Sequence, residues 1–258
     1  PYNYVMNNPL GMVDPDGKAV AEQREGGAGG SSGGCPPNCA YYEYSGGNAT
    51  GKALFFTQRG GVQSFTSGNL TYKLAGDHYY RLAGTSIQKV GINGILDEFD
   101  MNSEAGLRFR TTLGETGPSR EYTGGKYETN EGIAVVQLSI VNRLIRDRKP
   151  IEQILVPSQY HIVGKAKYND PITYITQMVS GRPQGGVINF VDQVWATSRS
   201  SQNALINLLA SSNLGMSSQN LVQVYGYSYS NLSTSGVDIP FNYSSTFIKH
   251  IFSGYGKR

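Results

Sequence analysis

The chain has little charge, few cysteines and no long apolar run. Asp, Glu, Lys and Arg make up 16% of its 258 residues, and the formal net charge is +3. Its longest basic run, RDRK at 146–149, is too short for a surface that follows a phosphate backbone, so we expect no nucleic-acid partner. A membrane-spanning helix needs about 18 or more apolar residues in succession. The sequence has no such run, and we expect no membrane span.

Cysteine and histidine are too sparse for a metal site. The two cysteines stand in CPPNC at 35–39, as either an incidental pair or a small disulfide, because two ligands do not make a zinc site. His78, His161 and His250 have no Cys or acidic partner at ligand spacing. The sequence therefore predicts no metal and no cofactor.

Glycine is abundant, with 33 residues, and it divides the chain. EGGAGGSSGG at 25–34 is typical of a flexible linker, and we predict that the segment 18–39 lacks regular structure. From 40 to 91, and most clearly over 52–82, short apolar and aromatic runs are separated by Gly-containing turns. This pattern predicts a small β-rich segment.

The remainder, 92–258, is predicted to be mainly helical, which makes the fold class α+β. Ser103 is a good N-cap for a helix that extends to Gly114. Further helices are expected at 170–180 and 200–212, followed by a Tyr-rich end of loops and short strands.

The strongest predicted element is a helix at 130–148. Asn130 is its expected N-cap, and Pro150 stops it. Apolar residues cover almost its whole circumference, and a helix of that kind is buried on all sides. We therefore expect it to be the central helix of its domain.

The first residues carry a dense motif, Pro9-x4-Asp14-Pro15-x-Gly17, within YNYVMNNPLGMVDPDG. On composition alone this is an ordinary strand and turn. It also resembles the signature that closes the core of Rhs and YD-repeat polymorphic toxins. There a β-cage encloses a C-terminal toxin and releases it by aspartyl self-cleavage just after the motif. Lys18 stands where that family usually has Leu, which leaves cleavage at this bond open.

The resemblance implies a domain order and a set of partners. Residues 1–17 would be the tail of the Rhs core with its processing motif, and the chain after the linker would be the toxin. The Rhs cage, a secretion machinery and a cognate immunity protein are the implied protein partners, and the periplasm of a target bacterium is one implied destination.

A second resemblance covers about 100–190. A series of short motifs is similar to the pattern of the cell-wall hydrolases typified by spore-cortex-lytic enzymes. The motifs are Gly114-Glu115, EG at 131–132, AV at 134–135 and VNR at 141–143. ILVPSQY at 154–160 and ITQMVSGRPQGGVINF at 175–190 are similar to later segments of that family.

This resemblance implies a lysozyme-like domain that cleaves the glycan strands of peptidoglycan as a lytic transglycosylase or muramidase. Glu115 would be the general acid/base, and Gln159 and Tyr160 would line the sugar cleft. The structural alternatives are a solvated loop carboxylate for Glu115 and a loop that packs Tyr160 on the core. Phe190 is expected in the core.

Glycosidic cleavage needs a carboxylic acid that protonates the leaving oxygen, and most glycosidases add a second carboxylate. A lytic transglycosylase needs only one, because a hydroxyl of the sugar itself attacks. The sequence does not mark a second carboxylate, although four positions are open: Glu121, Glu128, Asp170 and Asp192. The competing hypotheses are a toxin of another class, namely an ADP-ribosyltransferase or a nuclease, and a non-enzymatic binding module.

Overall fold

The computed structural model describes residues 35, 37–118, 127–180, 184–212, 218–222, 224–229 and 250–254. The motif residues Pro9, Asp14, Pro15 and Gly17, most of the predicted linker, and Glu121 lie outside these ranges. The fold class is α+β, as predicted, with an N-terminal β-rich segment.

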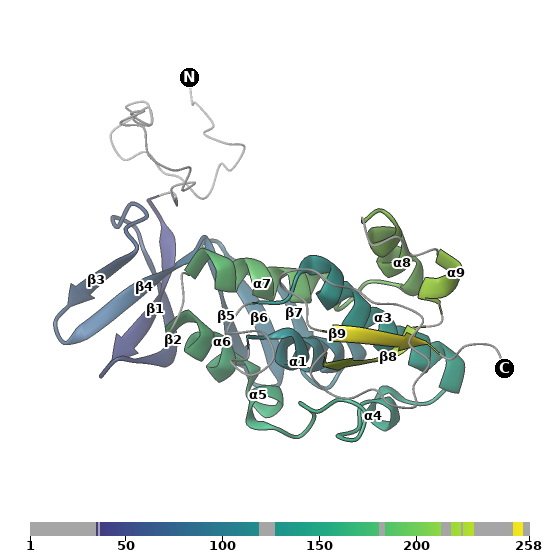
Figure 1. Ribbon diagram of the computed structural model, residues 1–258. Helices are drawn as coiled ribbons and strands as arrows, with labels where there is room; N and C mark the ends of the chain where they lie inside the picture. Colours follow the sequence, from purple (N-terminus) through teal and green to yellow (C-terminus); the bar gives the residue numbers. More distant parts are fainter. Residues whose placement is uncertain are drawn as a thin grey trace.

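Two antiparallel sheets form the N-terminal part (Figure 1). The first sheet has the order β2-β1-β4-β3, from β1 (Cys39–Ser45), β2 (Asn48–Phe56), β3 (Ser64–Ser67) and β4 (Leu70–Gly76). The second has the order β5-β6-β7, from β5 (His78–Ala83), β6 (Ser86–Gly91) and β7 (Gly94–Asp100). Because β7 pairs with β6, the domain boundary predicted after residue 91 falls inside this sheet.

A two-residue turn shows how the sequence sets the register of the first hairpin. Ser45 pairs with Asn48, and both intervening residues, Gly46 and Gly47, have positive φ. Glycine adopts these angles without steric cost, and such turns match the twist of the flanking strands.

Helices follow the sheets, with a short hairpin of β8 (Val224–Tyr229) and β9 (His250–Gly254) at the far end. The helices are α1 (Glu104–Thr116), α3 (Asn130–Asp147), α4 (Ile151–Ile154), α5 (Ala166–Asn169), α6 (Pro171–Ser180), α7 (Gln184–Thr197), α8 (Gln202–Ala210) and α9 (Ser218–Leu221). None of these helices combines the length and apolarity that a bilayer crossing needs.

The central helix is α3, as predicted. Every residue from Gly132 to Asn142 is buried, whereas Ile145 in the last turn is 54% exposed. The prediction of Asn130 as cap was wrong, because the side chain of Thr129 accepts from the Gly132 N–H. Arg148 ends the helix in the left-handed conformation, two residues before Pro150.

One hydrophobic core joins the sheets to the helices. Tyr80 of β5 and Phe99 of β7 pack on Trp195 of α7, and the Phe99 and Trp195 rings are stacked with centroids 3.9 Å apart. Helix α6 contacts β2 and β5, and α7 contacts β4. The β-rich segment is therefore a packing surface for the helices that carry the candidate site.

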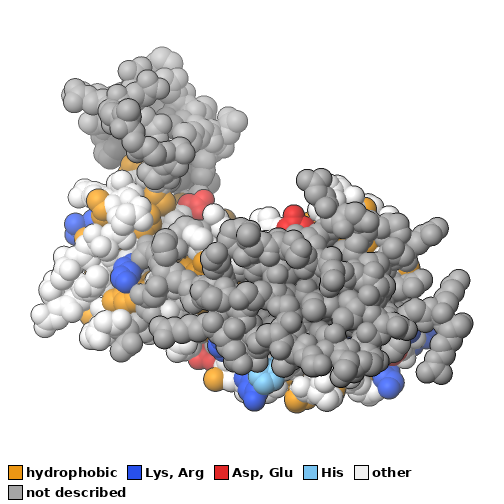
Figure 2. All heavy atoms as spheres, in the orientation of Figure 1, with side chains coloured by type: hydrophobic (Ala, Val, Ile, Leu, Met, Phe, Trp, Pro, Cys, Tyr) orange, Lys and Arg blue, Asp and Glu red, His pale blue; other side chains and the backbone are white. Residues whose placement is uncertain are grey.

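Lys and Arg side chains are scattered over the face shown in Figure 2. Among the side chains coloured there, they do not gather into one continuous basic patch.

Candidate functional site

Glu115 lies in the last turn of α1. The predicted helix end at Gly114 was wrong: Ser103 caps the helix as expected, but the helix continues to Thr116. Glycine is unfavourable inside a helix, but packing outweighs that cost here. A Cβ on Gly114 would come within 2.1 Å of the Ile162 side chain, so the 160–163 loop rests directly on the helix at this glycine.

This close approach fixes the Glu115 carboxylate. Its Oε1 accepts a hydrogen bond from the Ile162 N–H at 2.9 Å, and the residue is only 4% exposed. Of the two alternatives for Glu115, the structure has a buried and oriented carboxylate inside a helix rather than a solvated loop residue.

Tyr160 lies close to Glu115, but Gln159 faces solvent. The Tyr160 side chain packs in a cluster with Leu107 of α1 and Ile140 of α3, and it is 2% exposed. Burial raises the pKa of its phenol, and the negative charge of Glu115 adds to this rise. The hydrogen bond with Ser139 acts in the opposite direction and lowers the pKa. Tyr160 therefore lies near Glu115 but packs on the core, which is the structural alternative for this residue, and Gln159 lies at the surface.

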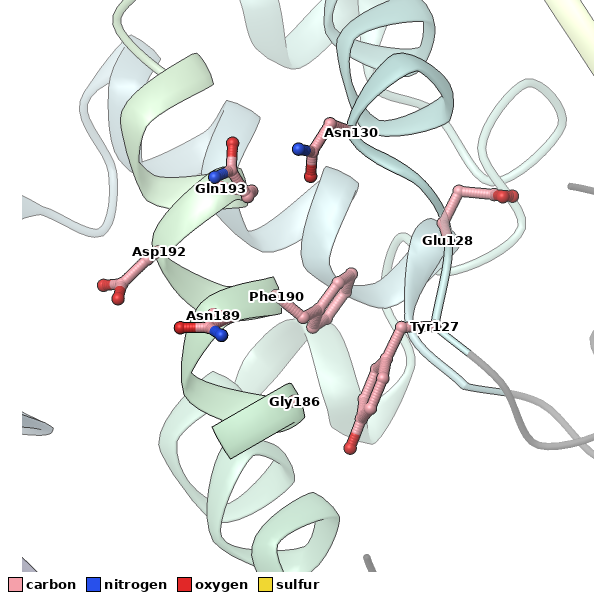
Figure 3. Close-up of a pocket in the computed structure, with 8 residues that line it drawn as sticks. All are labelled: Tyr127, Glu128, Asn130, Gly186, Asn189, Phe190, Asp192 and Gln193. Carbon is pink, nitrogen blue, oxygen red and sulfur yellow. The ribbon is translucent and has the colours of Figure 1, made fainter. Parts of the chain in front are cut away.

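A pocket of about 420 Å³ lies between the start of α3 and one side of α7 (Figure 3). It is lined by Tyr127, Glu128 and Asn130, and by Gly186, Asn189, Phe190, Asp192 and Gln193. The side chain of Asn130 points toward α7, whereas those of Glu128 and Asp192 point away from the pocket centre. Apart from these two carboxylates and Gly186, the lining residues are three carboxamides and two aromatic rings.

The pocket and Glu115 both lie near the C-terminal end of α1. The Glu128 N–H donates to the carbonyl of Thr116 at 3.3 Å, so the segment that leads into α3 lies against the residue after Glu115. The Glu128 side chain folds over Gly132, where an added Cβ would come within 2.6 Å of its Cγ. Glu115 itself is not among the lining residues.

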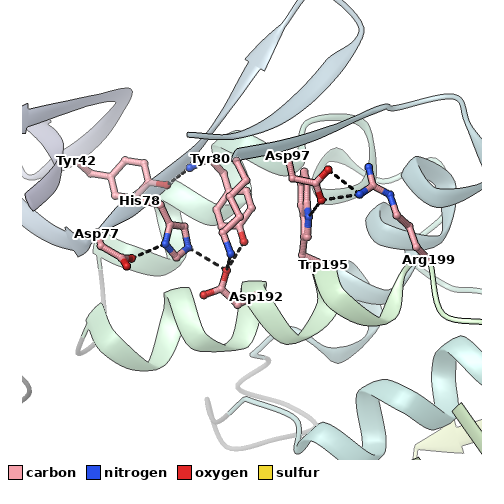
Figure 4. A network of polar contacts seen from close by, with 9 residues as sticks. Tyr42, Asp77, His78, Tyr80, Asp97, Asp192, Trp195 and Arg199 are labelled. Atoms are coloured by element: carbon pink, nitrogen blue, oxygen red, sulfur yellow. Dashed lines mark hydrogen bonds and ion pairs between the residues drawn. The ribbon is translucent and has the colours of Figure 1, made fainter. Parts of the chain in front are cut away.

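Asp192 anchors α7 to the second sheet (Figure 4). Its Oδ1 lies 2.5 Å from the Tyr80 hydroxyl, 2.8 Å from Lys89 Nζ and 2.9 Å from His78 Nε2. The other ring nitrogen of His78 contacts Asp77 at 2.6 Å. Burial alone would raise the pKa of Asp192, but the hydrogen bonds from His78, Lys89 and Tyr80 outweigh it and lower the pKa.

A second anchor holds the same helix one turn further on. Asp97 of β7 accepts from Trp195 Nε1 at 2.7 Å and forms an ion pair with Arg199. Burial works against ionisation of Asp97, yet the hydrogen bonds from Arg199 and Trp195 keep its pKa below the usual value. These two anchors fix the wall of the pocket that α7 provides.

Three of the four carboxylates that the sequence left open, Glu128, Asp170 and Asp192, lie within the described ranges, whereas Glu121 does not. Glu128 and Asp192 line the pocket, whereas Asp170 caps α6 by accepting from the Thr173 N–H at 3.0 Å. His161 is exposed beside Tyr160, and His250 begins β9. No group of three or more potential metal ligands occurs among the residues in the described ranges.

Cys35 and Cys39 meet as thiols rather than as a disulfide. Burial, together with the hydrogen bond that the Cys39 thiol donates to Cys35, raises the pKa of Cys39 to about 12. Of the two alternatives for this pair, the structure has an unlinked pair at the start of β1.

Asn189 and Gln193, two of the pocket residues on α7, had no role in the predictions from sequence, and Phe190 was expected only in the core. Gly186, Asn189, Phe190 and Gln193 follow the i, i+3, i+4, i+7 spacing of one helix face. Reading 184–197 as a helix would have found this stripe, but that segment carried only a family-like motif and no predicted helix.

Comparisons of this chain with protein-family models, with curated proteins and with solved structures found no match.

Proposed function

We propose that this protein cleaves the glycan strands of bacterial peptidoglycan, with Glu115 as the general acid and then the general base. The observation that carries the proposal is the pairing of a buried, oriented Glu115 with an adjacent pocket of carboxamides and aromatic rings. The resemblance to cell-wall hydrolases and the resemblance to the Rhs cage-closing motif point the same way.

The mechanism needs one carboxylic acid at the glycosidic oxygen. Glu115 donates its proton to the leaving oxygen, and the resulting carboxylate then removes a proton from the sugar hydroxyl that attacks, or from water. The Ile162 N–H holds one carboxylate oxygen in place, which orients the other. In this proposal the scissile bond lies at the end of α1, and the pocket holds the neighbouring sugar.

The proposal includes delivery of the protein to its target and protection of the cell that makes it. The protein acts in the periplasm of a target bacterium after release from an Rhs cage, and a cognate immunity protein covers the approach to Glu115. Toxicity should therefore require export to the periplasm. Killing by the cytoplasmic form alone would count against the wall as target.

The test is digestion of purified peptidoglycan, with the products identified by mass spectrometry. Glu115→Gln keeps an acceptor for the Ile162 N–H but has no transferable proton, so we expect activity to fall by roughly 10²–10⁴-fold with the fold retained. Glu152→Gln, on the exposed face of α4, is the matched control and should stay active. Native activity in Glu115→Gln would remove Glu115 from the mechanism.

Glu115→Ala separates the structural role from the chemical one. It leaves the buried Ile162 N–H without its acceptor, which costs about 1–3 kcal/mol of unfolding free energy. Urea unfolding should rank Glu115→Ala clearly below Glu115→Gln. Equal stability of the two variants would contradict this account of the contact.

A further inference from the structure

We propose that the pocket between α3 and α7 is a subsite for an uncharged N-acetylated hexosamine, of the N-acetylglucosamine type. This inference rests on the proposed function, because it assigns one sugar of the glycan strand to a defined place beside Glu115. Nothing in the two family resemblances assigns Asn130, Asn189 or Gln193 a role.

The side chains of the pocket can form many hydrogen bonds with a ligand. Asn130, Asn189 and Gln193 each present a side-chain amide, with two N–H donors and one carbonyl acceptor. None of these amides bonds to another residue in the described part of the chain. Sugar hydroxyls and an acetamide group both donate and accept, which matches three unengaged carboxamides.

The pocket also has an aromatic surface. Tyr127 is partly exposed, and its ring stacks on the buried ring of Phe190, with centroids 5.1 Å apart and planes 25° apart. Gly186 lies at the ring edge, where even a Cβ would come within 3.4 Å of Tyr127. Because residue 186 has no side chain, nothing from that position covers the ring, and a supported aromatic plane suits the apolar face of a pyranose.

The charge of the pocket lining selects among ligands. Among the residues that the structure describes, the lining includes two carboxylates, Glu128 and Asp192, and no Lys or Arg. Phosphate-bearing ligands such as NAD⁺ or nucleic acid are bound chiefly by Arg and Lys side chains, so the described lining favours an uncharged ligand over them. The same reasoning favours N-acetylglucosamine over N-acetylmuramic acid, whose lactyl group carries a negative charge.

The α7 wall of the pocket is rigid. The Asp192 and Asp97 anchors fix α7 on the second sheet, so the helix backbone that carries Asn189 and Gln193 is held in place before any ligand binds (Figure 4). A preformed site loses less conformational entropy on binding. The volume of about 420 Å³ is in the range of small-molecule pockets.

The experiment is calorimetric titration with tri-N-acetylchitotriose, an uncharged oligomer of N-acetylglucosamine. Asn189→Ala combined with Gln193→Ala should weaken binding about tenfold or more, since each lost hydrogen bond reduces affinity several-fold. Asn207→Ala, an exposed carboxamide on α8, is the matched control and should bind like the native protein. Circular dichroism checks that every variant is folded.

The outcomes separate this inference from the proposed function. Absence of trisaccharide binding, unchanged binding by the double variant, or competition by NAD⁺ would each overturn the subsite. If the protein binds the trisaccharide but never releases fragments from peptidoglycan, the subsite stands and the hydrolase proposal fails. If it cuts peptidoglycan and the double variant has an unchanged KM, the hydrolase proposal stands and the subsite fails.

Discussion

Asp192→Asn tests whether the carboxylate of Asp192 is a structural anchor or a catalytic group. Three donors converge on its Oδ1: the Tyr80 hydroxyl, Lys89 Nζ and His78 Nε2. Asparagine keeps an acceptor oxygen of similar shape but removes the negative charge. The perturbation therefore weakens every contact of the anchor and changes the packing little.

The magnitude follows from the kind of hydrogen bond. A hydrogen bond to a charged group contributes about 1.5–3 kcal/mol to stability, whereas a neutral one contributes about 0.5–1.5 kcal/mol. After the substitution, each of the three hydrogen bonds should therefore contribute about 1 kcal/mol less. The Asp192 side chain is 26% exposed and that of Lys89 23%, so solvent screens part of the attraction. We expect Asp192→Asn to lower the unfolding free energy by about 2–3 kcal/mol near pH 7.

The loss should depend on pH in a defined direction. The pKa of Asp192 is lowered in the folded protein, so as pH falls the unfolded chain takes up the proton first. The contribution of the charge is complete above the unfolded pKa of about 3.9 and is lost as pH falls through the lower folded value. The stability difference between native protein and Asp192→Asn should therefore narrow below about pH 4.

Urea unfolding followed by circular dichroism, at pH 7 and at several values below pH 4, measures both effects. Glu152→Gln is the control, because it removes an exposed carboxylate outside the network. An Asp192→Asn protein within about 0.5 kcal/mol of native at pH 7 would refute the anchor. Loss of peptidoglycan cleavage with unchanged stability would instead identify Asp192 as a second catalytic carboxylate.

Two further predictions concern the β-rich segment and the central helix. Because the pKa of the Cys39 thiol is about 12, little thiolate exists at pH 8, so iodoacetamide should label it far more slowly in the native protein than in urea. Equal labelling rates in a time course by mass spectrometry would contradict its buried position. Val136→Asp places an unpaired charge at a fully buried position and should cost about 3 kcal/mol or more, whereas Ile145→Asp, on the exposed last turn, should cost less than about 1 kcal/mol. Chemical denaturation checks both, and similar losses in the two variants would argue against a buried centre of α3.

The sequence by itself determined the features that depend on near neighbours. Ser103 caps α1 because its hydroxyl reaches the Gly106 N–H three residues on, a contact that local spacing alone permits. The buried centre of α3 follows from apolar residues all round the helix, and the hairpin turn follows from Gly46-Gly47. Glu115 could be singled out because its place after Gly114 resembles a known motif.

Only the tertiary structure decided where these elements meet. His78 and Asp192 are 114 residues apart, and no local pattern predicts that a strand histidine contacts a helix carboxylate. The end of α1 depends on the Ile162 loop resting on Gly114, which offsets the cost of glycine in a helix. The pocket likewise exists because Tyr127, before α3, stacks on Phe190 of α7. Local preferences set helices, strands and turns, whereas the site arises from contacts between distant segments whose pairing depends on how the whole core packs.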